Sequence, residues 1–233
     1  MLGALRLGTQ IVGELDVGFR SAEHDRWRSE FRLVWPDIKA AFELAVAREQ
    51  AAHATHLSRA WVGMWMDGRV REIEPLMQAA MDLVDRLEPP EQGDMLLAGV
   101  GLRFNMGDYE AARALIDRIR GGIALLSEDE ELPGTLELYE GYLAAGDSDM
   151  TAAERHLRES IHLLAQCGPG GGWIEAFAHN GLGSLLALRG DLAGTGAQRA
   201  PQPDLPAPLQ HRHHHRVGDP HAADQQRDSR QRE

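Results

Sequence analysis

Four short segments of similar, turn-like composition recur along the chain and strongly limit the folds that it can adopt. They read MDGRV, MGDYE, AGDSDM and RGDLA, and their glycines are Gly68, Gly107, Gly146 and Gly190. Glycine commonly ends a helix in the left-handed conformation, and an aspartate after it can cap the next helix. Because these glycines are 39, 39 and 44 residues apart, they predict a repeat in which one helix ends and another begins.

Apolar side chains around each turn follow helical periodicity, because steps of three and four residues place them on one stripe of a helix. The stripes after the turns are Val70, Ile73, Met77, Ala80 and Val84; Tyr109, Ala112, Ile116, Ile119 and Ile123; and Met150, Ala153, Leu157, Ile161 and Leu164. Before the turns, Trp61, Val100 and Tyr139 align seven residues ahead of the glycine, and Trp65, Phe104 and Leu143 align three residues ahead. Each unit is therefore predicted to be a helical hairpin whose apolar face is covered by its neighbours.

The same periodicity gives a map of the whole chain. Helices are predicted over residues 23–34, 36–50, 53–67, 69–87, 91–106, 108–126, 132–145, 149–166 and 173–189. Pro36 is expected to open the second of these helices, since proline is tolerated in a first turn. The fold class is therefore all-α, an array of antiparallel helical hairpins over residues 23–194. Residues 1–22 form a poorly defined N-terminal segment, for which no element is predicted.

Two sets of residues carry a resemblance to known proteins. The units LLAGVGLRFNMGDYEAARALIDRI and AFAHNGLGSLLALRGDLAG resemble tetratricopeptide-type repeats, in which G-D-Y-E-A-A leads into the second helix. The segments PDIKAAFELAVA and AWVGMWMDGRVREIEPLMQAAM are similar to the helical sensor domain of MalT-like, LuxR-type transcriptional regulators. The resemblance covers residues 24–194 and implies a right-handed superhelical, solenoid-like array of hairpins.

The resemblance does not extend to the other parts of such regulators. In that family an ATP-binding module precedes the repeats, and a helix-turn-helix often follows them. This sequence contains neither a Walker-type phosphate loop nor a basic helix-turn-helix. The resemblance therefore implies a fragment of a regulator, or a stand-alone relative of its sensor domain.

The last part of the chain, residues 195–233, departs from the repeat pattern. It contains no Trp, Phe, Tyr, Ile or Met but holds five of the 11 prolines, so it cannot bury enough apolar surface to offset its ordering entropy. A disordered tail is predicted. It could be a natural flexible tail, a metal-binding tract through His211, His213, His214 and His215, or a product of out-of-frame translation. The arginine-rich composition, with Lys39 as the one lysine, indicates GC-rich coding DNA and favours the last explanation.

Charge and composition exclude several functions. The formal net charge of −12 argues against binding to nucleic acid or an anionic membrane surface. The lack of a signal-peptide core or a long apolar run predicts a cytoplasmic location. Cys167 is the one cysteine, so neither an intramolecular disulfide nor a cysteine-based zinc site is expected. We expect no cofactor and no bound metal.

No segment carries the pattern of a catalytic site. The glycine-rich CGPGGGW stretch at residues 167–173 lacks the Lys and Ser/Thr of a phosphate-binding loop and is interpreted as a connection between repeats. The acidic run that follows Ser127 is interpreted as a helix-capping segment rather than a calcium loop. Neither a serine nucleophile signature nor metalloprotease histidine spacing is present. The chain is therefore predicted not to be an enzyme.

Binding is the remaining function. In tetratricopeptide-like solenoids the first helices of successive units line a concave groove, and here these are residues 53–67, 91–106 and 132–145. The predicted groove-lining residues are Trp61, Met64, Arg103 and Tyr142. Arg103 takes the repeat position of Met64 and Tyr142, and its guanidinium can fork onto a carboxylate, whereas the alternative is a solvated surface arginine.

The predicted function is thus a non-catalytic helical-repeat sensor or protein-interaction module, derived from a truncated LuxR-type regulator. Its partner would be a protein or a small effector held in the groove. The alternatives are a stand-alone repeat scaffold and a non-functional gene remnant. If the last hairpin lacks its second helix, the uncovered end is expected to promote self-association.

Overall fold

The computed structural model describes residues 2–21, 23–123, 130–167 and 171–190. Within these residues the chain is all-helical and contains no strand, which confirms the predicted all-α class. The predicted disordered tail at residues 195–233, with its four clustered histidines, lies outside the described residues. No helix in the described part of the chain combines the length and the apolar character needed to cross a membrane.

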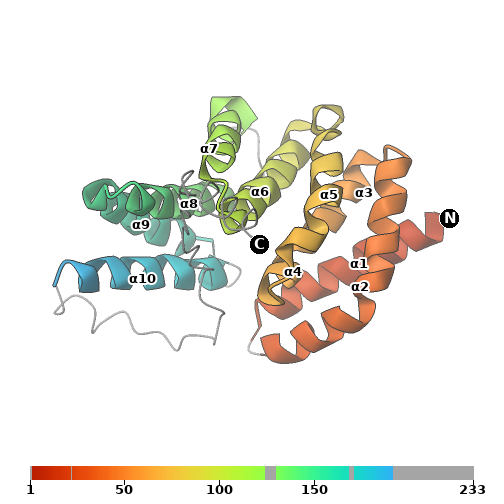
Figure 1. Ribbon diagram of the computed structural model, residues 1–233, viewed down its shortest axis with the longest axis horizontal. Coiled ribbons are helices and arrows are strands. Elements are labelled where there is room, and N and C mark those ends of the chain that lie inside the picture. Colours follow the sequence, from red (N-terminus) through yellow and green to blue (C-terminus); the bar gives the residue numbers. More distant parts are fainter. Residues whose placement is uncertain (1, 22, 124–129, 168–170, 191–233) are drawn as a thin grey trace, which may run out of the picture.

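The helices follow one another along an elongated molecule (Figure 1). Their bounds are α1 Leu2–Phe19, α2 His24–Ala47, α3 Ala51–Ser58, α4 Trp61–Met66, α5 Val70–Met81, α6 Pro89–Met106, α7 Tyr109–Arg118, α8 Leu132–Gly146, α9 Met150–Leu164 and α10 Gly171–Leu188. A short 3-10 helix, η1 Val84–Arg86, follows α5, and a π-helix, η2 Ile119–Ile123, follows α7. Helices α1 to α5 form one end of the molecule, α6 and α7 the middle, and α8 to α10 the other end.

The three predicted hairpins are present as the packed pairs α4–α5, α6–α7 and α8–α9. Most of the predicted stripe positions are buried, including all five from Val70 to Val84. Tyr109 is an exception, because 46% of its surface is exposed while its ring packs against Phe104 with a centroid distance of 5.5 Å. The periodicity therefore identified the inner faces of α5, α7 and α9.

The turns agree with the prediction at three of four glycines. Gly68, Gly107 and Gly190 adopt left-handed φ values of 70°, 80° and 77°. Gly146 instead remains within α8, and Ser148 takes the left-handed conformation with φ of 66°. This turn is longer than the others, so the helix stop moves toward the next cap. Asp149 then caps α9 by accepting a hydrogen bond from the Ala152 N–H at 2.9 Å.

The predicted break at Pro36 is wrong, since α2 continues through this residue from His24 to Ala47. Pro36 lies on the exposed side of the helix, whereas Phe31, Trp35 and Ile38 form a continuous buried stripe on the other side. Burial of this stripe offsets the backbone hydrogen bond that proline cannot donate.

Helix α1 was not predicted, because residues 1–22 showed no clear element in the sequence. It packs against α2 and α3, and its buried side chains are Leu5, Val12, Leu15 and Phe19. Gly8 permits a close crossing with α2, since a Cβ atom at this position would lie 2.6 Å from the Ala41 Cβ atom. The N-terminal segment is therefore part of the main hydrophobic core.

Candidate ligand-binding site

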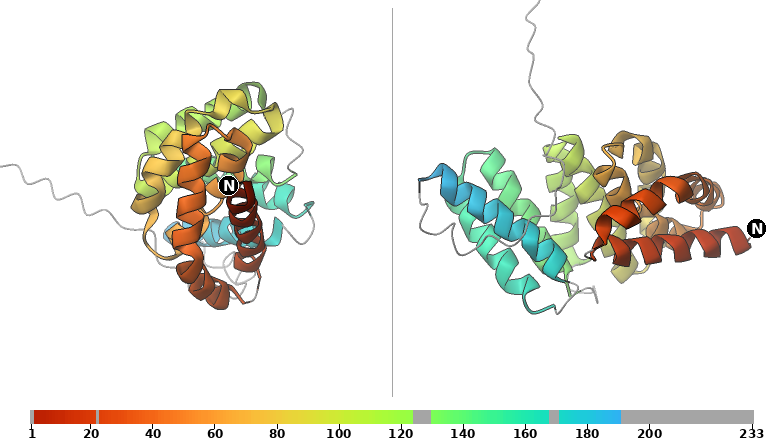
Figure 2. Two further views of the ribbon diagram at one scale, coloured as in Figure 1. Left: turned by 90° about the vertical axis from the view of Figure 1, so that its right-hand side faces the viewer. Right: turned by 90° about the horizontal axis from the view of Figure 1, so that it is seen from below.

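A cavity of about 520 Å³ lies between helices from both ends of the molecule. It is lined by α1 (Asp16, Val17), α4 (Trp61, Val62, Trp65), α6 (Asp94, Leu97, Ala98, Phe104, Asn105), α8 (Thr135, Leu138, Tyr139, Tyr142) and α10 (Trp173, Ile174, Phe177), and by Arg20, Arg59 and Glu131, which lie next to these helices. Seen from below in Figure 2, α1 and α10 lie on the same side of the molecule, at opposite ends. The last turns of α1 and the first turns of α10 both line the cavity.

Aromatic rings form much of the cavity wall. Contacting pairs have centroid distances of 4.8–6.4 Å, and the pairs are Trp61–Trp65, Trp65–Phe177, Trp173–Phe177, Phe104–Tyr139 and Phe104–Tyr142. The contact between Trp65 and Phe177 joins α4 to α10, which are far apart in the sequence. The rings thus form two groups that line the same cavity, one from α4 and α10 and the other from α6 and α8.

Two glycines make room for these rings. A Cβ atom on Gly101 would lie 2.4 Å from the Trp61 ring and 2.8 Å from the Tyr139 hydroxyl. A Cβ atom on Gly181 would lie 2.8 Å from the Tyr142 ring. Because no side chain projects at Gly101 and Gly181, the indole and phenol rings pack directly on the helix backbones.

The two tyrosines of the wall are neutral groups. The Tyr142 hydroxyl donates a hydrogen bond to the Phe177 carbonyl at 2.8 Å and thereby ties α8 to α10. Burial raises the pKa of Tyr139 and of Tyr142 above the ordinary tyrosine value. Both rings therefore present an uncharged aromatic surface across the physiological pH range.

A chain of charged side chains borders the other end of the cavity. Arg59 lies between Asp94 and Asp16, with closest N–O distances of 3.1 Å and 3.7 Å. Arg20 lies between Asp16 and Glu131, at 3.6 Å and 2.7 Å. These alternating ion pairs connect α1 to α6 and to the start of α8, and they fix α1 as one wall of the cavity.

The four predicted groove-lining residues have different positions. Trp61 and Tyr142 line the cavity. Met64 is completely buried in the core, because it lies on the face of α4 that packs against α2, α5 and α6. The opposite face of α4 lines the cavity. Arg103 points to α5, where its guanidinium donates to the Glu74 carboxylate at 3.3 Å and to the Gln78 side chain. Met64 and Arg103 thus hold the fold together outside the cavity.

A pattern in the sequence could have identified more of the residues that line the cavity. Trp61 and Tyr139 share the position seven residues before the turn glycine, and Trp65 and Phe104 share the position three residues before it. All four rings line the cavity. The contributions of α1 and of Trp173 and Phe177 in α10 carried no comparable signal, since they depend on how the ends of the chain pack.

A second polar cluster joins α8, α9 and η2. The His156 Nδ1 atom lies 2.7 Å from a Glu137 carboxylate oxygen and 3.2 Å from a Glu140 oxygen, and Arg120 contacts the same two carboxylates at 2.6 Å and 2.8 Å. Burial raises the pKa of Glu140; it would also raise that of Glu137, but hydrogen bonds from His156 and Arg120 lower it. His156, Glu137 and Glu140 are ligand types for divalent metals, but the Arg120 guanidinium already contacts both carboxylates. The cluster is explained as an ion-pair network between helices.

The remaining motifs of the sequence contribute to connections. The Cys167 thiol donates to the Glu130 carbonyl at 3.0 Å and so links the end of the α8–α9 hairpin to its beginning. Residues 168–170 of the glycine-rich stretch and residues 127–129 of the acidic run lie outside the described residues.

Comparison with known proteins adds no assignment to this geometry. No protein-family model matches the chain, and neither the curated proteins nor the solved structures give a match. The function must therefore be inferred from the cavity and its lining.

Proposed function

We propose that this chain is a non-catalytic sensor module that binds a small organic molecule in the cavity between α1, α4, α6, α8 and α10. In this proposal the hairpins form a right-handed, tetratricopeptide-like superhelical array, and the cavity is its concave groove. The observation that carries the proposal is the ring-lined cavity of about 520 Å³. Small-molecule sites typically measure about 300–1,000 Å³ and combine apolar walls with a few polar groups.

The distribution of lining residues supports a specific site rather than a packing defect. Apolar and aromatic side chains come from five helices, whereas the charged groups are gathered near one end. The ion pairs of Arg20 and Arg59 hold that end in place. An arrangement of this kind orients a ligand, because apolar burial supplies affinity and the polar groups select one orientation.

The position of α1 favours a small effector over an extended peptide. Arg20, directly after α1, reaches Glu131 at the start of α8, and Asp16 and Val17 of α1 line one side of the cavity. The sequence resemblance to the sensor domain of LuxR-type regulators is consistent with an effector-binding role. The chain would then be a fragment or a stand-alone relative of such a domain, and the DNA-binding and ATP-dependent steps would belong to other modules.

Binding of a neutral aromatic probe tests this proposal. We expect N-phenyl-1-naphthylamine to gain fluorescence on addition of the protein and to raise its melting temperature, because it binds the native state. Trp65→Leu, in the cavity wall, should weaken binding by about tenfold or more, equivalent to about 1.4 kcal/mol. Trp27→Leu is the matched control, because Trp27 lies on α2 outside the cavity.

The result depends on both variants remaining folded, which circular dichroism and thermal unfolding establish. Absence of probe binding to the unmodified protein would contradict the proposal. So would equal losses of affinity in the Trp65 and Trp27 variants, since the probe would then bind elsewhere.

A further inference from the structure

We infer that the cavity selects organic cations, that is, ligands with an ammonium group at the charged end and an apolar or aromatic body between the rings. This inference rests on the proposed small-molecule site and adds the chemical class of its ligand. Three features of the lining support it: the balance of charges, the aromatic walls and the separation between the two ends.

The charged groups that line the cavity carry one more negative than positive charge. Asp16, Asp94 and Glu131 oppose the two guanidinium groups of Arg20 and Arg59. The side chains of Asp16 and Asp94 are only 18% and 28% exposed, so their charges are less screened than those of surface carboxylates. The formal net charge of −12 also draws cations toward the protein.

Helix dipoles indicate which carboxylates matter most. Asp16 lies in the last turns of α1, where the helix dipole adds negative potential. Glu131 lies at the start of α8, where the opposite end of a dipole offsets part of its charge. The helix dipole therefore favours Asp16 as a recognition group, and Asp94 lies on the other side of Arg59 from it. The Arg59 side chain is 42% exposed, so an ammonium group can share these two carboxylates with it while Arg20 still bridges Asp16 and Glu131.

The aromatic wall favours the same class of ligand. The faces of indole and phenol rings carry partial negative charge and attract ammonium groups within about 6 Å. Trp61, Trp65, Tyr139 and Trp173 all line the cavity, and the tyrosine is held neutral by its burial. Neither the aromatic wall nor the charged end of the cavity has an excess of positive charge that would favour an anionic ligand.

The charged end and the aromatic end of the cavity are well separated along α6 and α8. On α6 the lining runs from Asp94 to Phe104, and on α8 it runs from near Glu131 to Tyr142. At 1.5 Å per residue, each run is roughly 15 Å long. A ligand that touches both ends thus has a cationic group and an apolar body of about this length.

A matched set of three ligands tests the inference. The set is 8-phenyloctan-1-amine, 8-phenyloctan-1-ol and 8-phenyloctanoate, which are long enough to reach both ends, differ at the polar end and carry positive, zero and negative charge. Each competes with N-phenyl-1-naphthylamine in a fluorescence titration. The amine is expected to displace the probe at a concentration about tenfold lower than the alcohol, and the carboxylate is expected to be the weakest competitor.

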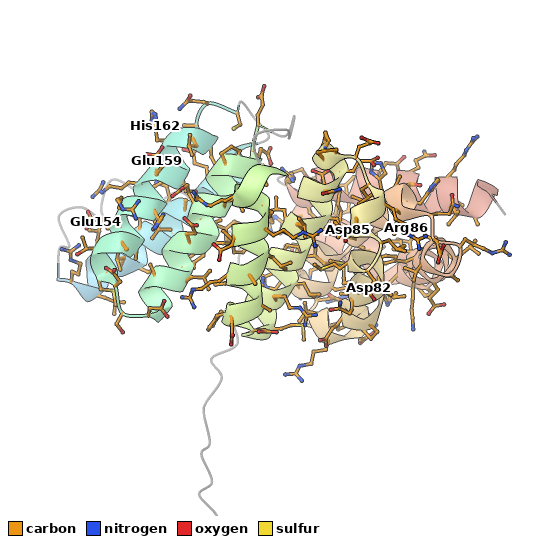
Figure 3. All side chains as sticks on the ribbon, turned by 90° about the horizontal axis from the view of Figure 1, so that it is seen from above. Asp82, Asp85, Arg86, Glu154, Glu159 and His162 are labelled. Carbon is orange, nitrogen blue, oxygen red and sulfur yellow. The ribbon has the colours of Figure 1, made fainter. Side chains whose placement is uncertain are left out.

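Substitution of Asp94 and Asp16 tests whether these carboxylates cause the preference for the amine over the alcohol. In Asp94→Asn and in Asp16→Asn the amine should bind no more tightly than the alcohol. The ratio of the two affinities within one variant is the readout, because these carboxylates also pair with Arg20 and Arg59 and their loss can change the binding of every ligand. Asp82→Asn makes the same change of net charge at an exposed position outside the cavity, labelled in Figure 3, and should leave the preference intact.

The outcomes separate the inference from the proposed function. If the alcohol or the carboxylate competes as well as the amine, the cation preference is overturned while the cavity remains a binding site. The same holds if the preference persists in both the Asp94 and the Asp16 variants. If the neutral probe itself does not bind, the proposed function fails, and the inference fails with it.

Discussion

Removal of residues 1–22 is expected to abolish the cooperative thermal unfolding of the chain. Helix α1 buries Leu5, Val12, Leu15 and Phe19 against α2 and α3. Each such side chain contributes about 1.5–3 kcal/mol when fully buried, so their combined contribution rivals the whole unfolding free energy of a typical domain, about 5–15 kcal/mol. The truncated chain should show no sharp transition by calorimetry and should bind hydrophobic dyes non-specifically.

Two point variants show whether this effect comes from the buried face of α1. Leu15→Ala should cost about 2–5 kcal/mol, because it leaves a cavity in the core. Leu7→Ala, on the same helix but 57% exposed, should change the unfolding free energy by no more than about 0.5 kcal/mol. A truncated chain that unfolds cooperatively near the melting temperature of the full chain would show that α1 is not part of the core.

Replacement of Asp67 by asparagine is expected to have the second largest effect on stability. The Asp67 carboxylate is 3% exposed and lies 2.6 Å from Arg32 and 3.3 Å from Arg28, both on α2. It thus joins the end of α4 to α2. Loss of these charge-assisted hydrogen bonds at a buried acceptor should cost on the order of 2 kcal/mol at neutral pH.

The same ion pairs make this contribution dependent on pH. Burial alone would raise the pKa of Asp67, but the hydrogen bonds from Arg32 and Arg28 outweigh it and hold the pKa below the ordinary aspartate value. A carboxyl group with a lowered folded-state pKa stabilises the fold above its unfolded value and loses that effect as the pH falls through the folded value. The stability difference between the unmodified protein and Asp67→Asn should therefore be constant at neutral pH and shrink below about pH 4.

Asp85→Asn is the matched control for this prediction. Asp85 pairs with Arg118 at 2.5 Å, but its side chain is 85% exposed (Figure 3). Surface ion pairs contribute about 0–1 kcal/mol, so this variant should unfold almost as the unmodified protein does. Urea unfolding of all three proteins from pH 7 down to about pH 3 covers the range below about pH 4 in which the contribution of the Asp67 ion pairs begins to be lost. An Asp67→Asn effect that does not depend on pH would argue against the buried ion pairs as its cause.

Helix ends and buried apolar stripes could be predicted from local patterns in the sequence. Gly68 and Gly107 ended helices as predicted, because the left-handed conformation is a local preference of glycine. The stripe from Val70 to Val84 was buried as predicted, because a helix with one apolar face can be stable only when that face is covered. Such features depend on a few neighbouring residues and are readable without a structure.

Other features depend on contacts between distant segments. Helix α1 was missed because Gly3, Gly8, Gly13 and Gly18 weaken its helical pattern, whereas Gly8 and Gly18 are needed for close contacts with Ala41 and Trp27. The helix is stabilised by packing rather than by the propensities of its residues.

The lining of the cavity also depends on contacts between distant segments and could be predicted only in part. Of the residues selected by alignment on the turn glycines, Trp61 and Tyr142 line the cavity, whereas Met64 and Arg103 face neighbouring helices. A repeat position specifies a face of one helix. Whether that face lines the cavity or packs against another helix depends on the positions of α1 and α10, which the repeat pattern does not specify.

The central claim is that rings from α4 and α10 meet around one ligand. Nuclear Overhauser spectroscopy of the protein with bound N-phenyl-1-naphthylamine measures this directly, because the Trp65 and Phe177 ring centroids are 5.8 Å apart. We expect cross-peaks between these two rings and from the probe to both of them. Cross-peaks from the probe to neither ring, or the absence of a Trp65–Phe177 cross-peak while the Phe104–Tyr139 pair is visible, would contradict the claim.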